Sequence, residues 1–138
     1  MNYSLIIPIY NEEKTLKILL SQLKNLADNI EIIIINDGST DNTKSILDKQ
    51  NSFKIIHNLT NKGKGSSIIT GAYHALNDTI ILMDGDLEID INSIPKAIEA
   101  YEFHQNYIIL GNRWNEKSST IHNINTYGNF LINFLFNS

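Results

Sequence analysis

Residues 30–35 read I-E-I-I-I-I, and this isoleucine run decides the fold class. A β-branched run that is apolar on both faces is typical of a central parallel strand covered by helices on both sides. A leucine pattern at helical spacing precedes the run, at Leu16, Leu19, Leu20, Leu23 and Leu26. The two patterns together predict an α/β sheet.

Strand and helix patterns alternate along the rest of the chain. We expect further strands at 3–9, 53–57, 79–83 and 107–110, and further helices at 41–49, 66–76 and 94–103. Asn11 is the expected cap of the leucine-rich helix, and Thr40 or Asp41 that of the next helix. Such alternation implies right-handed crossovers and a doubly wound, mostly parallel sheet with helices on both faces.

Composition describes one ordinary globular domain over residues 1–138, with 42% hydrophobic and 19% charged side chains. The chain has no cysteine, which excludes disulfides and thiolate metal sites and fits a reducing compartment. A net charge of −4 argues against broad nucleic-acid binding. No apolar run approaches the roughly 20 residues of a membrane span and no signal-peptide pattern opens the chain, so we expect a cytoplasmic protein.

Polar clusters follow three of the predicted strands: Y-N-E-E at 10–13, N-D-G-S at 36–39 and D-G-D at 84–86. Ligands of doubly wound sheets bind beyond the carboxyl ends of the strands. The three clusters therefore predict one shared site.

The third cluster puts Asp84, Asp86 and Glu88 directly after a buried-type strand. In an extended chain these side chains would share a face, about 6.5 Å apart. Carboxylates at that separation repel unless a cation intervenes, and Mg²⁺ or Mn²⁺ suits all-oxygen ligands. The alternative is an acidic turn in which Asp84 or Asp86 caps the next element.

Residues 61–66, N-K-G-K-G-S, open a predicted helix, and helix N-termini favour anions. Lys62 and Lys64 are therefore candidate phosphate contacts, with a solvated basic turn as the alternative. A Walker A loop is excluded because its first glycine is missing. Asp37 and Glu12 can accept hydrogen bonds from a base and a ribose, while a turn with a helix cap is the alternative for residues 37–41.

Five motifs carry a family resemblance when taken in order: P-x-Y-N-E at 8–12, D-G-S-x-D at 37–41, N-K-G-K-G at 61–65 with Gly71, D-x-D-L-E at 84–88 and G-N-R at 111–113. The whole chain resembles a family 2 glycosyltransferase with the GT-A, Rossmann-like nucleotide-binding fold. The resembled branch includes dolichol-phosphate mannosyl- and glucosyltransferases.

The resemblance implies a UDP- or GDP-sugar donor and metal-assisted hexose transfer, with inversion, to a polyprenyl-phosphate or glycan acceptor. By it, Asp84, Asp86 and Glu88 would bind Mg²⁺ or Mn²⁺. Asp86 and Arg113 would be the catalytic residues, with Arg113 facing the acceptor phosphate; a pair with Glu116 is the alternative for this arginine. The implied donor-binding residues are Pro8, Tyr10, Asn11, Glu12, Asp37, Ser39, Lys62, Lys64, Asp84 and Gly85.

The chain departs from the resembled pattern in two respects. No second arginine follows Arg113, so Lys117 or His122 would have to hold the acceptor phosphate. Relatives also continue past the position of Ser138, so we expect the C-terminal acceptor part to be missing. A non-catalytic nucleotide-sugar-binding domain is therefore an alternative. A sugar nucleotidyltransferase is a weaker one, because residues 10–12 replace the glycine-rich loop typical of that class.

The C-terminal stretch predicts an amphipathic helix. Its apolar face comprises Tyr127, Phe130, Leu131, Phe134 and Leu135, opposed by Asn125, Asn129, Asn133 and Asn137. We expect it to pack on the sheet or on the partner subunit of a homodimer. Peripheral membrane contact is the alternative, weakened by the absence of lysine and arginine from the polar face.

Overall fold

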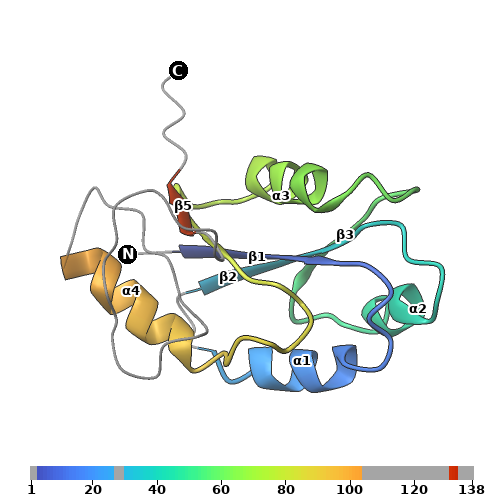
Figure 1. Cartoon of the computed structure of the whole chain (residues 1–138), viewed down its shortest axis with the longest axis horizontal. Helices are drawn as coiled ribbons and strands as arrows, with labels where there is room; N and C mark the ends of the chain where they lie inside the picture. The colour runs from blue at the N-terminus through green and yellow to red at the C-terminus, as the bar shows by residue number, and fades with distance from the viewer. Residues whose placement is uncertain (1–2, 27–29, 104–130, 134–138) are drawn as a thin grey trace.

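A computed structural model of the chain describes residues 3–26, 30–103 and 131–133. They form a five-stranded sheet in the order β3-β2-β1-β4-β5 (Figure 1). The strands are β1 (Tyr3–Ile9), β2 (Ile30–Asn36), β3 (Lys54–His57), β4 (Thr79–Leu82) and β5 (Leu131–Asn133). The helices are α1 (Leu16–Leu23), α2 (Thr43–Leu47), α3 (Lys64–Tyr73) and α4 (Ser93–Phe103).

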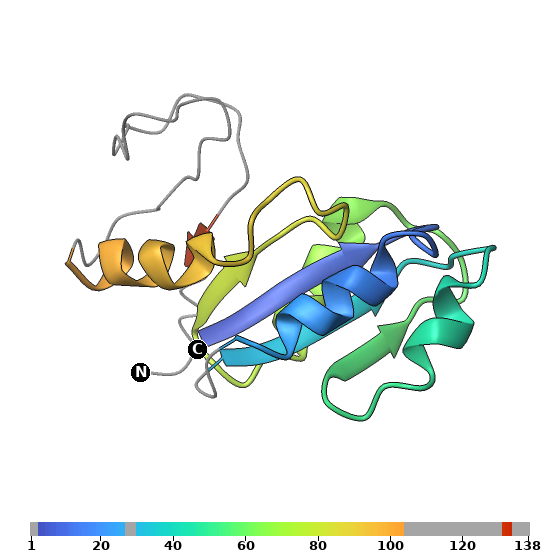
Figure 2. The ribbon, with the colours of Figure 1, turned by 90° about the horizontal axis from the view of Figure 1, so that it is seen from below.

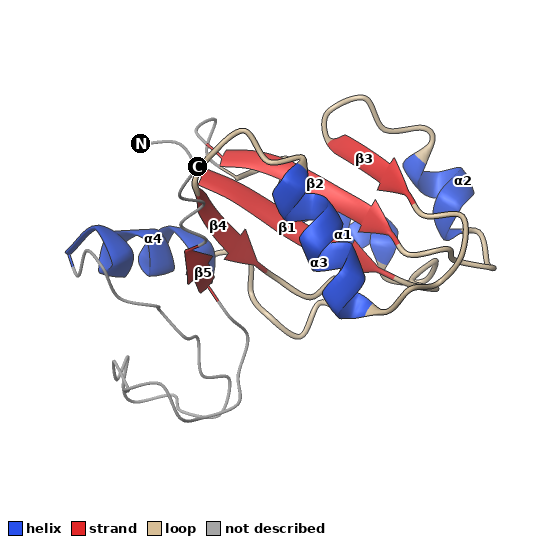
Figure 3. Cartoon of the chain, turned by 90° about the horizontal axis from the view of Figure 1, so that it is seen from above, coloured by secondary structure: helices blue, strands red, loops and turns tan. Residues whose placement is uncertain are grey.

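Four of the five strands are parallel, and β1 lies at the centre of the sheet. β1 pairs with β2 on one side and with β4 on the other, while β3 extends the sheet beyond β2 (Figure 3). β5 adds to β4 in the antiparallel direction. The predicted doubly wound, mostly parallel sheet is confirmed.

Helices cover both faces of the sheet (Figures 1 and 2). Alternate residues of β1 face opposite cores: Leu5 packs with residues of α1, α2 and α4, whereas Ile6 belongs to the core beneath α3. In β2 the same division separates Ile34 from Ile33 and Ile35, all fully buried. The isoleucine run is therefore apolar on both faces because each face has its own helical cover.

Helix α3 lies so close to the sheet that Gly71 has no room for a side chain. A Cβ at this position would approach Ile6 Cγ2 to 2.5 Å and Ile35 Cδ1 to 2.8 Å. Gly71 thus allows α3 to pack closely on the two central strands, β1 and β2.

Several element boundaries differ from the predicted ones. α3 begins at Lys64, two residues before the predicted start, and α2 is limited to Thr43–Leu47. Asn11 does not cap α1; its side chain accepts a hydrogen bond from Thr40 instead. Asp41 does act at the start of α2, because its Oδ1 accepts the Thr43 N–H at 2.9 Å.

The C-terminal helix prediction is wrong for residues 131–133, which form β5. The open edge of β4 carries backbone N–H and C=O groups that need partners, and β5 supplies them. The remaining residues of that prediction, and the predicted strand at 107–110, lie outside the described part of the chain. Within the described part, no helix is long and apolar enough to cross a membrane.

Candidate functional site

The loops that follow β1 and β2 are tied together at the carboxyl ends of these strands. The Asn11 N–H donates to Ser39 Oγ at 2.9 Å, and the Thr40 N–H donates back to Asn11 Oδ1 at 2.8 Å. Asn11 adopts a φ of 56°, in the left-handed region that asparagine tolerates better than most residues. Asn11 and Ser39 therefore hold two predicted clusters side by side.

A second set of hydrogen bonds joins the same two loops, two residues further along each of them. The Glu13 N–H donates to Asp41 Oδ2 at 3.1 Å, and the Asn42 N–H donates to Glu13 Oε2 at 3.0 Å. The Glu12 N–H adds a bond to Thr43 Oγ1 at 2.9 Å. Burial raises the pKa of the Asp41 carboxyl, but hydrogen bonds, those with Thr43 foremost, outweigh burial and lower it. The ionised carboxylate of Asp41 is thus part of the loop structure.

Asp37 is buried and binds the loop between β3 and α3. Its Oδ1 accepts hydrogen bonds from Asn58 Nδ2 at 2.7 Å and from the Lys62 N–H at 3.1 Å, while its Oδ2 accepts the Gly63 N–H at 2.8 Å. Burial alone would raise the pKa of Asp37, but the hydrogen bonds outweigh burial and hold this pKa below its ordinary value.

Gly38, the next residue, lets the loops after β2 and β3 touch. Its φ is +69°, and a Cβ here would lie 2.4 Å from the carbonyl carbon of Thr60. Glycine alone satisfies both conditions without strain. Together, Asp37 and Gly38 fix the basic turn at 61–65 against the end of β2.

The first residue of α3 contacts the loop that follows β4. Lys64 Nζ lies 2.5 Å from Asp84 Oδ1, with 58% of the lysine side chain and 23% of the aspartate side chain exposed. The candidate phosphate contact and the candidate metal ligand are therefore direct neighbours. Contacts therefore link the loops that follow all four parallel strands, where the shared site is predicted.

The acidic cluster departs from the extended geometry expected for it. Asp86 Oδ1 accepts the Glu88 N–H at 3.0 Å, and Leu87 has a φ of 64°, so the chain turns immediately after β4. The acidic turn expected as the alternative describes this backbone, but its expected cap is wrong, because Asp90 and not Asp84 or Asp86 accepts hydrogen bonds at the start of α4. Within the described residues, no three Asp, Glu or His side chains converge as a ready-made metal cluster.

Two carboxylates nonetheless match what a hard divalent ion requires. Mg²⁺ commonly takes one or two protein carboxylates and completes its coordination with substrate phosphates and water. Asp84 already holds a cationic group, the Lys64 ammonium. The donor chemistry of Asp84 and Asp86 thus fits a metal that arrives with a phosphate ligand.

The other predicted site residues have varied surroundings. Tyr10 is 44% exposed, and Glu12 Oε2 accepts the Thr15 hydroxyl at 2.6 Å. Gly85 is buried, Pro8 is half-buried and the Lys62 side chain is exposed. Arg113 lies outside the described residues, and its predicted role stays a prediction.

Sequence reasoning missed Asn58, although its side chain donates to the central carboxylate of the site at 2.7 Å. Asn58 directly follows β3, so it occupies the same topological position as the three clusters that were recognised. Its position at a strand end was the available signal. It was a weak one, because a single asparagine in a turn is common.

Comparison with known proteins places this geometry in context. The sequence profile described as "Glycosyl transferase family 2" matches residues 4–137. The "Dolichol-phosphate mannosyltransferase" of Pyrococcus furiosus is 35% identical over 119 residues, covering 83% of this chain and 34% of that protein. This chain thus spans about a third of the length of that curated relative.

Solved structures share the fold. S. aureus TarS 1-349 in complex with UDP-GlcNAc superposes with a TM-score of 0.68 at 26% identity, covering 80% of this chain and 34% of the other. The mannosyltransferase PcManGT from Pyrobaculum calidifontis, solved with GDP-Man and Mn²⁺, gives a TM-score of 0.64 at 20% identity, covering 72% and 32% of the two chains. The latter likeness is one of fold alone.

Proposed function

Because the chain belongs to glycosyl transferase family 2, we propose that it forms the donor-binding part of an enzyme that moves a hexose from a nucleotide sugar to a polyprenyl phosphate. The single observation that carries the proposal is the contact between Lys64 and Asp84, which joins a phosphate-type residue to a metal-type residue. The donor class is supported by the UDP-GlcNAc bound to TarS, and the acceptor class by the name of the Pyrococcus furiosus relative.

The diphosphate of the donor would bind between the N-terminus of α3 and the turn after β4. Asp84 and Asp86 would hold Mg²⁺ or Mn²⁺ there, and Glu88 would be a further ligand of the metal. The metal would neutralise the charge that develops on the leaving diphosphate. Lys64, once released from Asp84, and Lys62 would supply further positive charge to the same phosphates.

Asp37 has a different part in this proposal from the one that its sequence motif suggests. An ionised carboxylate offers about four acceptor sites, and three hydrogen bonds already occupy the buried Asp37 carboxylate. Little of this carboxylate is therefore left for a nucleobase to contact. We therefore assign Asp37 to positioning the turn at 61–65, and Glu12 with Tyr10 to the nucleoside.

On the acceptor side, a polyprenyl phosphate brings an oxygen that is already anionic. No strong general base is then needed to activate it, and the main task of the protein is to orient the acceptor phosphate. Arg113 remains the proposed contact for that phosphate and Asp86 the proposed catalytic carboxylate, with inversion at the anomeric carbon.

Calorimetric titration of UDP and GDP, each with and without Mn²⁺, tests the donor site. We expect one nucleotide to bind only when the metal is present, and Asp84→Asn to weaken that binding at least tenfold. Asp78→Asn, at an exposed acid away from the site, is the matched control. Equal affinity with and without Mn²⁺ would remove the metal from the proposal, and no binding by a folded protein would end it.

A donor-binding domain without turnover is the second candidate, because the chain spans only about a third of the compared relative. Release of free UDP or GDP separates the two. Release that depends on added polyprenyl phosphate supports transfer by this chain, whereas nucleotide-sugar binding without acceptor-dependent release supports binding alone.

A further inference from the structure

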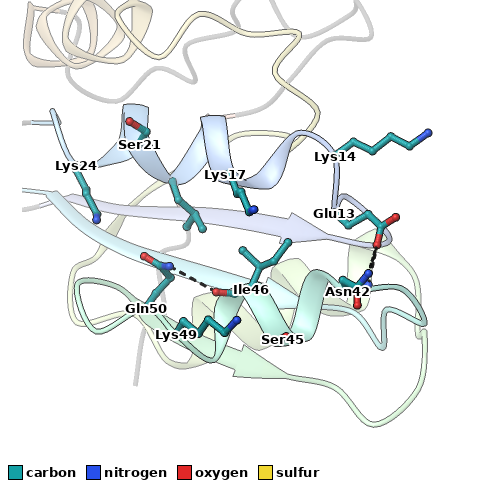
Figure 4. Close-up of a pocket in the computed structure, with 11 residues that line it drawn as sticks. Glu13, Lys14, Lys17, Ser21, Lys24, Asn42, Ser45, Ile46, Lys49 and Gln50 are labelled. Atoms are coloured by element: carbon teal, nitrogen blue, oxygen red, sulfur yellow. Dashed lines mark hydrogen bonds between the residues drawn. The ribbon is translucent and has the colours of Figure 1, made fainter.

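A groove of about 710 Å³ separates α1 from α2, on the face of the sheet opposite α3 (Figure 4). Leu20 and Ile46 contribute apolar surface to it, and Ser21, Ser45 and Gln50 contribute polar groups. Its volume lies within the range of small-molecule sites. Neither the donor site nor the motifs of the family resemblance account for this groove.

Four lysines line the groove: Lys14, Lys17, Lys24 and Lys49. Figure 4 shows Lys17 and Lys24 pointing from α1 toward α2, with Lys49 on the opposite wall and Lys14 turned away. Lys17 and Lys24 are two helical turns apart, which separates their backbone positions by about 10 Å. Three ammonium groups thus border one concave surface.

These lysines differ from the others in their partners. Lys44, Lys54 and Lys64 each form an ion pair with a carboxylate, whereas no such pair joins Lys14, Lys17, Lys24 or Lys49 to a described residue. One acid, Glu13, lines the groove together with the lysines. Glu13 accepts two hydrogen bonds from Asn42, and Asp48 binds Lys44 and His57.

Four lysines against one carboxylate leave the lining of the groove with a net positive charge, although the whole chain carries a net charge of −4. Like charges that face one surface repel one another, and a bound anion would relieve that repulsion. Solvated lysines on two helix faces are the ordinary alternative. Leu20 and Ile46, which add apolar surface to the lining, distinguish this shallow groove from a uniformly charged face.

We propose that the groove between α1 and α2 is a second anion-binding site, which takes a ligand that carries at least two phosphate groups. Lys17 and Lys24 would bind its two ends from α1, and Lys49 would bind it from the facing wall. Lysine binds phosphate as a point charge, so the site requires charge density rather than a fixed bidentate geometry. A soluble diphosphate and a phosphorylated lipid head group share this chemistry.

Amide NMR of the full-length ¹⁵N-labelled chain, titrated with inorganic pyrophosphate in the presence of a metal chelator, tests the site. We expect saturable shifts at Lys17, Ser21, Ser45 and Lys49. Replacing both Lys17 and Lys24 by Gln should weaken binding by roughly tenfold, since a surface charge contact contributes at most about fivefold. Lys44→Gln, on α2 but outside the groove and already paired, should leave the affinity unchanged.

The Lys64→Gln variant separates this proposal from the donor site. It should leave the shifts along α1 and α2 intact, because Lys64 lies on the other face of the sheet at the start of α3. Shifts confined to residues 61–65, or an affinity that the Lys17/Lys24 double variant does not change, would overturn the groove proposal without touching the donor site.

Co-sedimentation with vesicles identifies the source of the phosphate. Binding to vesicles that contain phosphatidylinositol 4-phosphate, whose head group has two phosphates, but not to pure phosphatidylcholine, lost in the double variant, assigns the groove to a lipid head group. Binding of pyrophosphate without vesicle association assigns it to a soluble ligand. Failure of both probes overturns the proposal.

Discussion

Lys64 Nζ lies 2.5 Å from Asp84 Oδ1, so the first residue of α3 neutralises the first acid after β4. A lysine ammonium and a divalent cation compete for the same carboxylate oxygen. The contact would therefore couple the proposed metal binding at Asp84 to the position of Lys64.

Replacing Lys64 by Met should tighten Mn²⁺ binding to the nucleotide-free protein, because the competing cation is gone. The expected gain is modest, about two- to fivefold, since the pair is partly exposed to solvent. Titration followed by Mn²⁺ electron paramagnetic resonance measures it. Lys62→Met, which removes a neighbouring charge without breaking the pair, is the control, and an equal gain in both variants would contradict a specific competition.

Replacing Asp37 by Asn should destabilise the fold by about 2 kcal/mol, because one of the two oxygens of this buried carboxylate that accept N–H groups of the 61–65 turn becomes an amide donor. Urea unfolding followed by circular dichroism gives the free energy of unfolding. Asp78→Asn, at an exposed position, should change it little. A wild-type stability in Asp37→Asn would mean that the turn does not depend on this carboxylate.

Lowering the pH should destabilise the protein, because the pKa values of Asp37 and Asp41 are both lowered in the folded state. These two carboxyls set the pH range in which stability is lost. A carboxyl with a lowered folded pKa stabilises fully above its unfolded value of about 3.9, and this contribution is lost as the pH falls through the folded pKa. Urea midpoints should therefore fall below about pH 4. The urea midpoint should depend less steeply on pH in Asp37→Asn. An identical slope in the variant and the wild type would show that Asp37 does not contribute to this pH dependence.

Replacing Gly38 by Ala should cost about 1–3 kcal/mol, because the residue combines a φ of +69° with a backbone contact of 2.4 Å from its would-be Cβ. Gly65→Ala is the matched control. Gly65 lies in α3 with nothing within 4 Å of a Cβ, so alanine there should stabilise by about 0.5–1 kcal/mol. Thermal unfolding of both variants tests the pair, and a Gly38→Ala protein as stable as the control would contradict the close approach.

Local sequence patterns predicted the sheet well, because each central strand is apolar on both faces and needs no distant information to be recognised. β1 matches its predicted bounds, and β2 extends only one residue beyond the isoleucine run. The start of α3 was less predictable. The N–H groups of Lys62 and Gly63 bind a carboxylate 25 and 26 residues away, and no local pattern reports that contact.

The site was predicted as a gathering of strand ends but not in its detailed geometry. Asp84, Asp86 and Glu88 were expected along an extended chain, which the positive φ of Leu87 interrupts. Asn11 was expected to cap α1, but its side chain serves the neighbouring loop. In both cases the sequence pattern fits either conformation equally well. Turn geometry decides the conformation of residues 84–88, and a tertiary contact decides the partner of Asn11.

The hydrogen bonds from the Asn11 N–H to Ser39 Oγ and from the Glu13 N–H to Asp41 Oδ2 have a consequence for the thermodynamics of binding. They join residues 28 positions apart, so this side of the site is ordered before any ligand arrives. The bonds of Asp86 and Asp90, in contrast, run within the loop that follows β4. When a ligand binds, most of the conformational entropy that is lost should therefore be lost by the loop that follows β4. A substitution that makes only this loop more mobile should make the ligand dissociate faster.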